Sequence, residues 1–231
     1  ETGVITAIHL QDGQVVKQGE VLIELDATQN RADRDRASSE YRAALVEAAR
    51  LHALIAGKAT FTGPDDADPG FVLLQQQLLR DQAAEYLARV DAARHLVGQR
   101  KAAVDATREN LRRLEATVPM EDERAAAYRA LLVQQYVSKM DYLQFEQQRI
   151  DKAQEWAGQK SKLRQDQAAL AESQQNYQAL ISDFQQSKQA ELSAMEMKAA
   201  SLIQEVRKAG QKTELQKLVS PIDGVVQQLA V

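Results

Sequence analysis

The sequence predicts a mainly α-helical protein: a long antiparallel coiled-coil hairpin with an additional N-terminal helix, inserted between two halves of a small β-domain. Three observations predict this class. Ala, Gln, Leu, Arg, Glu and Lys dominate, with only 10 Gly and 4 Pro in 231 residues, which is the composition of long helices and coiled coils. Apolar residues repeat every seven positions through the middle of the chain. Both ends are instead rich in β-branched residues.

The first 26 residues are predicted to form one half of the β-domain. Short apolar runs are separated by turn signals at Asp12-Gly13 and at Gly19. Strands this short are not stable alone, and the segment 224–231 aligns with 3–10 through a shared Gly and matching apolar residues. We therefore expect 1–26 and 219–231 to be two halves of one domain related by a pseudo-twofold. The ends of the helical insertion, 27–218, must then meet in space.

The insertion is expected to open with a helix over about 29–56. Asp26 or Thr28 can cap its start, and Gly57 is a suitable end. A loop rich in Gly, Pro and Asp follows. Asp68 before Pro69 predicts the start of the next helix, about 70–134, because proline suits the first helical position.

Heptads predict how this second helix packs. One row of the seam is Val90, Val97, Val104, Leu111 and Val118, and the companion positions include Val72, Leu79, Tyr86, Ala93 and Leu114. Ala125, Tyr128 and Leu132 continue the register beyond Pro119, where we expect a kink or an interruption.

The chain is predicted to reverse at about 134–138. Ser138 and Asp141 have the spacing of a capping box, so a new helix, about 139–217, starts there. It carries Leu163, Leu170, Tyr177 and Phe184, seven residues apart, and then an eleven-residue step to Met195. Mixed steps of seven and eleven predict a loosely supercoiled pair of helices.

The stretches Gly13-Gln-Val-Val-Lys-Gln-Gly19-Glu-Val-Leu-Ile-Glu-Leu25-Asp26 and Ser220-Pro-Ile-Asp-Gly224-Val-Val resemble the two halves of a lipoyl-like domain. Interrupted by a helical hairpin, they resemble the periplasmic adaptors, or membrane fusion proteins, of Gram-negative export systems. The additional helix before the hairpin is similar to the HlyD type of type I secretion. Arg124, Leu131 and Ser138 reproduce the Arg-x6-Leu-x6-Ser tip motif of that family.

The resemblance implies a periplasmic adaptor that bridges an inner-membrane ABC transporter to a TolC-like outer-membrane channel, with Arg124, Leu131 and Ser138 docking on the channel. It also implies a homo-oligomer, a hexamer, in the assembled system. The full-length protein is expected to be anchored in the inner membrane through a segment absent from this chain, which we interpret as a fragment with a truncated second half-domain. The alternatives are an adaptor of a multidrug efflux pump and a coiled-coil scaffold outside export.

The heptad register supports two of these docking residues independently. If Val118 is position a, Arg124 and Leu131 both fall at g, beside the seam, where a leucine is partly exposed and an arginine can present its planar fork. Ser138 has a structural alternative, since its hydroxyl can simply cap the next helix.

The sequence predicts no catalytic residue, no metal and no cofactor, and therefore no enzyme. It has no Cys, and His9, His52 and His95 are scattered without the spacing of a metal site or a triad. Carboxylates alternate with Lys and Arg, as in solvated helix pairs, and the net charge of −4 disfavours nucleic acid. The segment 195–199 faintly echoes a biotinylation sequence at Lys198, but it lies inside a helix, so no carrier role is expected. Trp156 fits either the seam or an interface.

Overall fold

The computed structural model describes residues 4–11 and 13–227. It contains two compact units, one made of residues 1–83 with 185–231 and the other of residues 84–184. The elements follow one another as β1 (Ile5–Ile8), β2 (Val15–Val16), β3 (Val21–Leu25), α1 (Thr28–Ile55), α2 (Pro69–Val133), α3 (Lys139–Leu215), β4 (Lys217–Val219) and β5 (Gly224–Val225). The predicted fold class is confirmed.

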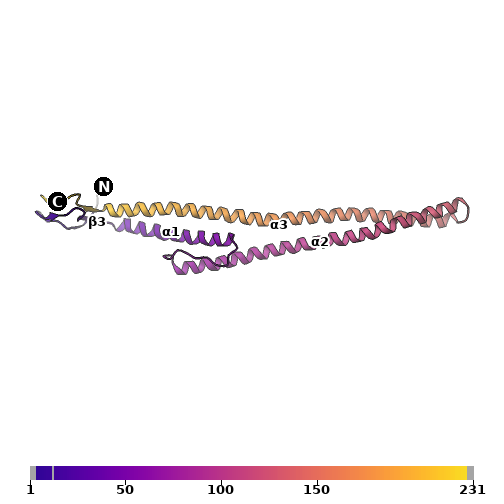
Figure 1. Cartoon of the computed structure of the whole chain (residues 1–231), viewed down its shortest axis with the longest axis horizontal. Coiled ribbons are helices and arrows are strands. Elements are labelled where there is room, and N and C mark those ends of the chain that lie inside the picture. The colour runs from indigo at the N-terminus through magenta and orange to yellow at the C-terminus, as the bar shows by residue number, and fades with distance from the viewer. Residues whose placement is uncertain (1–3, 12, 228–231) are drawn as a thin grey trace. The chain divides into compact units, whose positions relative to one another are not determined.

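Strands from the two ends of the chain pair with one another in the first unit (Figure 1). One sheet has the order β1-β3-β4 and the other pairs β2 with β5, all antiparallel. Asp223 Oδ1 also accepts a hydrogen bond from the backbone N–H of Gln18 at 2.7 Å. Strand pairing and this hydrogen bond therefore connect the N-terminal strands to the C-terminal ones. The proposed alignment of 224–231 with 3–10 lies partly outside the described residues, at Gly3 and 228–231.

Helix α1 starts differently from the expectation, because neither Asp26 nor Thr28 is its N-cap. The cap is Ala27, whose side chain makes no capping hydrogen bond. Asp26 stands one residue earlier and accepts the Thr28 N–H at 2.9 Å. Hydrogen bonds from Thr28 hold the pKa of Asp26 below its ordinary value. The carboxylate thus satisfies a free first-turn amide from outside the helix.

The predicted end of α1 at Gly57 is confirmed. Gly57 has a φ of +65°, the left-handed region that favours glycine. The N–H of Lys58 donates to the carbonyl of Ala53 at 2.8 Å, and that of Gly57 to Leu54 at 3.2 Å. These two bonds form a Schellman motif, which occupies carbonyls that the helix end leaves free.

Helix α1 packs on the C-terminal part of α3 within the first unit (Figure 1). Two small apolar clusters join them: Ala44 with Ala199 and Leu202, and Ala48 and Leu51 with Leu192. Each cluster contains at least one alanine, whose small side chain lets the helices approach closely.

Arg50 of α1 is a buried residue that the sequence did not predict, with 6% of its surface exposed. Its Nη1 donates to Gln82 Oε1 of α2 at 2.6 Å. Burial lowers the pKa of Arg50, against the attraction of Glu191 and Glu47. The first unit therefore joins α1 to α2 through this polar contact, and joins α1 to α3 through the apolar clusters and a contact of His52 Nε2 with Glu196 Oε1 at 3.1 Å.

The start of α2 is as predicted, with Pro69 as its first residue. Asp68 Oδ1 accepts the N–H of Gly70 at 3.1 Å, and the Asp68 carbonyl accepts that of Val72 at 3.0 Å. The aspartate side chain thus caps the helix at its positive end.

Of the two outcomes expected at Pro119, the interruption is wrong, because α2 is continuous from Pro69 to Val133, and the kink stays a prediction. Proline lacks the N–H that would donate to the carbonyl of Glu115, and its ring crowds that carbonyl. Pro119 is exposed, however, and the next seam position, Ala125, is 3% exposed. Packing of the same rows on both sides of the proline outweighs the lost hydrogen bond.

Burial within each unit follows the predicted rows. In α2, Val104, Leu111, Leu114 and Ala125 are buried and Val90, Val97 and Val118 half-buried. In α3, Leu163, Leu170, Tyr177 and Phe184 are half-buried, and beyond the eleven-residue step Leu192, Ala199 and Leu202 are buried. The buried apolar groups thus form narrow seams, as the composition predicts.

Candidate docking site at the hairpin turn

The turn between α2 and α3 is built from five residues, 134–138, within the second unit. The N–H of Tyr136 donates to the carbonyl of Leu131 and that of Gln135 to Leu132, each at 3.0 Å. This is again a Schellman motif. Its left-handed position is filled by Gln135, with a φ of 62°, where α1 has Gly57.

Ser138 and Asp141 form the predicted capping box. The N–H of Asp141 donates to Ser138 Oγ at 3.1 Å, and the N–H of Ser138 donates to Asp141 Oδ2 at 3.2 Å. The Ser138 hydroxyl also donates to Asp141 Oδ2 at 2.6 Å. This hydroxyl is therefore engaged as donor and acceptor in starting α3.

Arg124 is anchored by its own helix and by α3. Its Nη1 lies 3.4 Å from both carboxylate oxygens of Glu121, and its Cζ lies 5.9 Å from the centre of the Phe145 ring. Phe145 stacks on Tyr128 with ring centres 3.9 Å apart. The Arg124 side chain remains 53% exposed, so its remaining N–H groups can reach a partner.

Leu131 is 37% exposed, as its position beside the seam predicts. Arg124 and Leu131 are two turns apart on α2 and therefore share a side of the helix. Among the described residues, no hydrogen bond joins Arg124 to Ser138, which bind Glu121 and Asp141 respectively.

The turn also exposes large apolar side chains that the motif does not include. Val133 is 80% exposed, Met140 76% and Tyr136 75%. We call these three residues the apolar cap. Heptad rows in the sequence do not predict these residues, because such rows locate the side chains that face the seam, whereas these three lie at and beyond its end.

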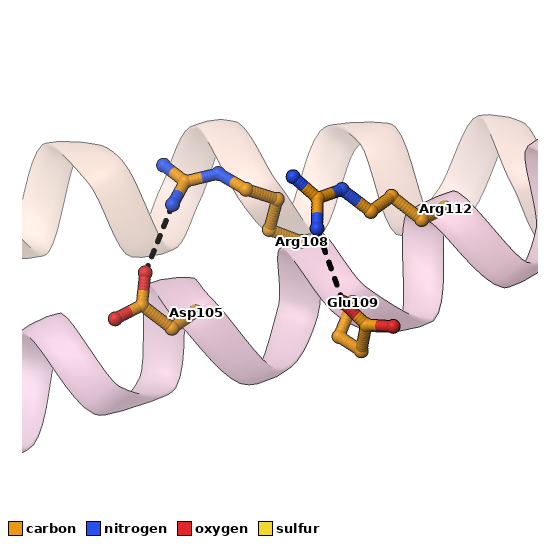
Figure 2. A network of polar contacts seen from close by, with 4 residues as sticks. All are labelled: Asp105, Arg108, Glu109 and Arg112. Atoms are coloured by element: carbon orange, nitrogen blue, oxygen red, sulfur yellow. Dashed lines mark hydrogen bonds and ion pairs between the residues drawn. The ribbon is translucent and has the colours of Figure 1, made fainter.

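Elsewhere on the second unit, most charged pairs lie along one helix, although Arg149 of α3 also lies 3.6 Å from Asp122 of α2. Figure 2 shows Arg108 with Asp105, at 2.9 Å, and Arg112 with Glu109, at 3.5 Å, one turn apart on α2. Such pairs are solvated and contribute only tenths of a kcal/mol each, about 0.2–0.5 kcal/mol. Within residues 4–11 and 13–227, no group of three or more His, Cys, Asp or Glu is placed to hold a metal ion.

Trp156 belongs to the seam side of α3, seven residues before Leu163, and is half-buried. Its Nε1 is buried without a hydrogen-bond partner in the described part of the chain, and Lys160 Nζ lies 5.1 Å from the centre of its ring. Of the two interpretations open for Trp156, the structure favours the seam.

Comparison with known proteins places this hairpin in a family. Residues 30–212 match the family model described as "AprE, long alpha-helical hairpin". The chain belongs to this family. The match covers α1, α2 and nearly all of α3, so the AprE-type hairpin is the part of the chain that the family defines.

The curated relatives of this AprE-type hairpin include the protein CyaD of Bordetella pertussis, from two strains, each 28% identical over 233 residues. The match takes in 99% of this chain and 46% of the relative. The chain thus spans about half the length of the curated relatives it matches.

Solved structures with a similar fold include those of LipC and EmrA. The soluble domain of LipC, described as a membrane fusion protein of a type I secretion system, has a TM-score of 0.88 at 22% identity, covering 98% of this chain and 88% of LipC. The periplasmic adaptor protein EmrA has a TM-score of 0.52 at 18% identity, covering 99% of this chain and 64% of EmrA. The resemblance to HlyD-type adaptors is confirmed at the level of family and fold. No helix among the described residues has the length and apolarity needed to cross a bilayer.

Proposed function

We propose that the chain is the hairpin-bearing part of a periplasmic adaptor subunit in a tripartite type I protein secretion system. It bridges an inner-membrane ABC transporter to a TolC-like outer-membrane channel. The observation that carries the proposal is the AprE-type hairpin itself: strands from both parts of the chain that flank the helices pair, and α2 reverses into α3 at a turn with exposed apolar side chains. Such a turn is a suitable contact surface.

The docking surface we propose comprises Arg124, Leu131 and the apolar cap, with Ser138 acting through the fold of the turn. The exposed cap supplies apolar area to bury against the channel, and Arg124 supplies directed N–H donors. Ser138 contributes by starting α3 in the right place, because its hydroxyl already binds Asp141.

Further parts of the proposal concern the whole assembly. The division into half-domains at 1–26 and 219–231 around a hairpin domain at 27–218, the inner-membrane location and a hexameric arrangement follow from the resemblance to HlyD-type adaptors. In this role the protein acts by binding, with no reaction, cofactor or nucleic acid of its own.

Secretion with a reversed charge tests the docking surface. Arg124→Asp should reduce export at least tenfold or abolish it while helicity stays unchanged, because Arg124 is exposed and contacts only Glu121 and the face of the Phe145 ring, whose stack on Tyr128 stays in place. Arg112→Asp is the matched control, since Arg112 is also exposed on α2 and paired with the residue three positions before it. Equal export by the two variants would contradict the proposal and favour the scaffold.

Crosslinking in living cells identifies the partner directly. The chain has no cysteine, so Leu131→Cys and Tyr136→Cys are unique probes in it. We expect both to capture the outer-membrane channel and Ala116→Cys, exposed further along α2, not to do so. Capture from position 116 alone would contradict docking at the turn.

Type I secretion is preferred over drug efflux on one observation. LipC, whose fold is similar with a TM-score of 0.88, is described as a membrane fusion protein of a type I secretion system. Export assays with a protein cargo and with small drugs in one strain separate the two functions. Drug resistance that depends on this chain, without protein export, would favour the efflux adaptor.

A further inference from the structure

Three pairs of side chains cross between α2 and α3 at regular intervals in the second unit. Tyr86 stacks on Phe184, with ring centres 3.8 Å apart, and Tyr128 stacks on Phe145 at 3.9 Å. Between them, Thr107 Oγ1 donates to Asp166 Oδ2 at 2.7 Å.

The spacing of these pairs follows the heptad repeat. On α2 the three residues stand at 86, 107 and 128, two equal intervals of 21 residues, or three heptads. On α3, positions 145 and 166 are also 21 residues apart, and 184 follows after 18. The three pairs therefore lie at similar intervals along the seam of this unit.

The central pair is polar, although it lies within the seam. Thr107 is 7% exposed and the Asp166 side chain 12%, while the neighbouring seam residues Val104 and Leu111 are apolar and buried. Lys162 Nζ lies 2.9 Å from Asp166 Oδ1. Hydrogen bonds from Thr107 and then Lys162 hold the pKa of Asp166 below its ordinary value, so this carboxylate is charged.

The valine row of α2 does not specify one register by itself. The ion pair that also crosses to α3, Arg149 with Asp122 at 3.6 Å, has an Asp122 side chain that is 52% exposed, so it holds the register only weakly. Val90, Val97 and Val104 are identical residues seven apart, so a slip of one heptad leaves valine in the same row. A polar residue in a coiled-coil seam is known to select one register from such equivalent ones.

The effect of a slip depends on its direction. Moving position 166 seven residues along α2 towards the turn would bring Asp166 to Leu114, leaving a charge in an apolar place. Moving it the other way would bring Asp166 to Arg100, an attractive partner, but would take Phe145 from Tyr128 to Glu121. The polar pair opposes the first slip, and the aromatic stacks are needed against the second.

We propose that Tyr86–Phe184, Thr107–Asp166 and Tyr128–Phe145 together form a register lock, in which these six residues position α2 against α3 and so fix which residues form the turn. The lock goes beyond the proposed docking function, since it is a property of the chain by itself. It bears on docking because a slip would move residues 131–140 out of their present places.

Distances between two spin labels on the full chain test the lock. Cysteines replacing Ala116 on α2 and Ala171 on α3, both exposed, are unique because the chain has no other cysteine. In the present register they are offset by about 20 Å along the helices. A slip of one heptad changes this offset by about 10 Å, shortening it when position 166 meets Leu114 and lengthening it when it meets Arg100.

The decisive variant replaces all six residues of the lock by leucine. We expect it to keep its helicity but to show more than one label distance, whereas the parent shows one. The matched control replaces Val90, Val97, Val104 and Val118 by leucine, keeps the three pairs, and should show the parent distance alone. A single parent distance in the six-leucine variant would overturn the proposal and assign the register to the contacts that remain, which include the turn and the Arg149–Asp122 pair.

Two partial variants decide the matter if the six-leucine variant loses helicity. Thr107→Leu with Asp166→Leu should add the shorter distance, and replacement of the four aromatic residues by leucine should add the longer one. The parent distance alone in both would overturn the lock. The label measurement needs no partner, so its failure is separate from a failure of the docking proposal.

Discussion

Gln135 holds the left-handed position of the turn at a φ of 62°, and a side chain there is strained against the following carbonyl. Gly57 occupies the corresponding left-handed position at the end of α1, where the absence of a side chain avoids this strain. Tyr136 and Leu131 are held together by the backbone bond that this conformation permits. The strained conformation of Gln135 therefore helps to position Leu131 relative to Tyr136 of the apolar cap.

Glycine at position 135 should relieve the strain. We expect Gln135→Gly to raise the free energy of unfolding by roughly 0.5–1 kcal/mol, the gain from removing a side chain in the left-handed region less the added freedom of the unfolded chain. Thermal or denaturant unfolding measures it. Gln134→Gly is the control, since Gln134 is not among the described residues with positive φ, and it should be neutral or destabilising. Destabilisation by Gln135→Gly as well would show that the turn is not strained.

Among the elements, α2 tolerates an internal proline without a break. Seam residues on both sides of Pro119 keep one heptad register, from Leu111 to Ala125. The residue before a proline is normally driven away from the helical region, yet Val118 is helical here. Tertiary packing thus holds a helix that local preferences disfavour at this point.

Removing the proline should stabilise α2. We expect Pro119→Ala to raise the free energy of unfolding by up to about 3 kcal/mol, because alanine restores the N–H and removes the clash with the Glu115 carbonyl. Met120→Ala, at the neighbouring exposed position, is the control and should change it by less than about 0.5 kcal/mol. Denaturant unfolding compares the variants. No gain at position 119 would mean that the helix is already relaxed around its proline.

At the scale of the whole molecule, stability is divided between two compact units. The first depends on the clusters that join α1 to α3, where Leu51 is 1% exposed. The second depends on the seam between α2 and α3 and on the turn. Contacts confined to near neighbours allow parts of a protein to open separately.

A cavity made in the first unit should therefore destabilise that unit and leave the second unit almost unchanged. We expect Leu51→Ala to cost about 3 kcal/mol and to lower hydrogen-exchange protection in α1 and in residues 185–215, with little change in residues 84–184. Leu74→Ala is the control, because Leu74 belongs to the same unit but is 62% exposed. An equal loss of protection at the turn would show that the two units unfold as one.

Local patterns in the sequence already locate the helices, the seam rows, the glycine end of α1, the proline start of α2 and the Ser138 capping box. Each of these is a property of neighbouring residues, because capping and periodicity are decided within a few turns. They also show that Arg124 and Leu131 lie beside the seam. The assignment of Arg124, Leu131 and Ser138 to docking came from resemblance and stays a prediction.

By itself, then, the sequence determined where the helices and strands of this protein form and which rows they bury. Only the tertiary structure decided which residues of one row meet those of another: Arg50 with Gln82, Thr107 with Asp166, and Leu51 with Leu192. It also decided that packing overrides Pro119 and that Val133, Tyr136 and Met140 are left exposed. The physical reason is that heptads repeat, so every seven-residue shift satisfies the local pattern equally, and only contacts distant in sequence distinguish the shifts.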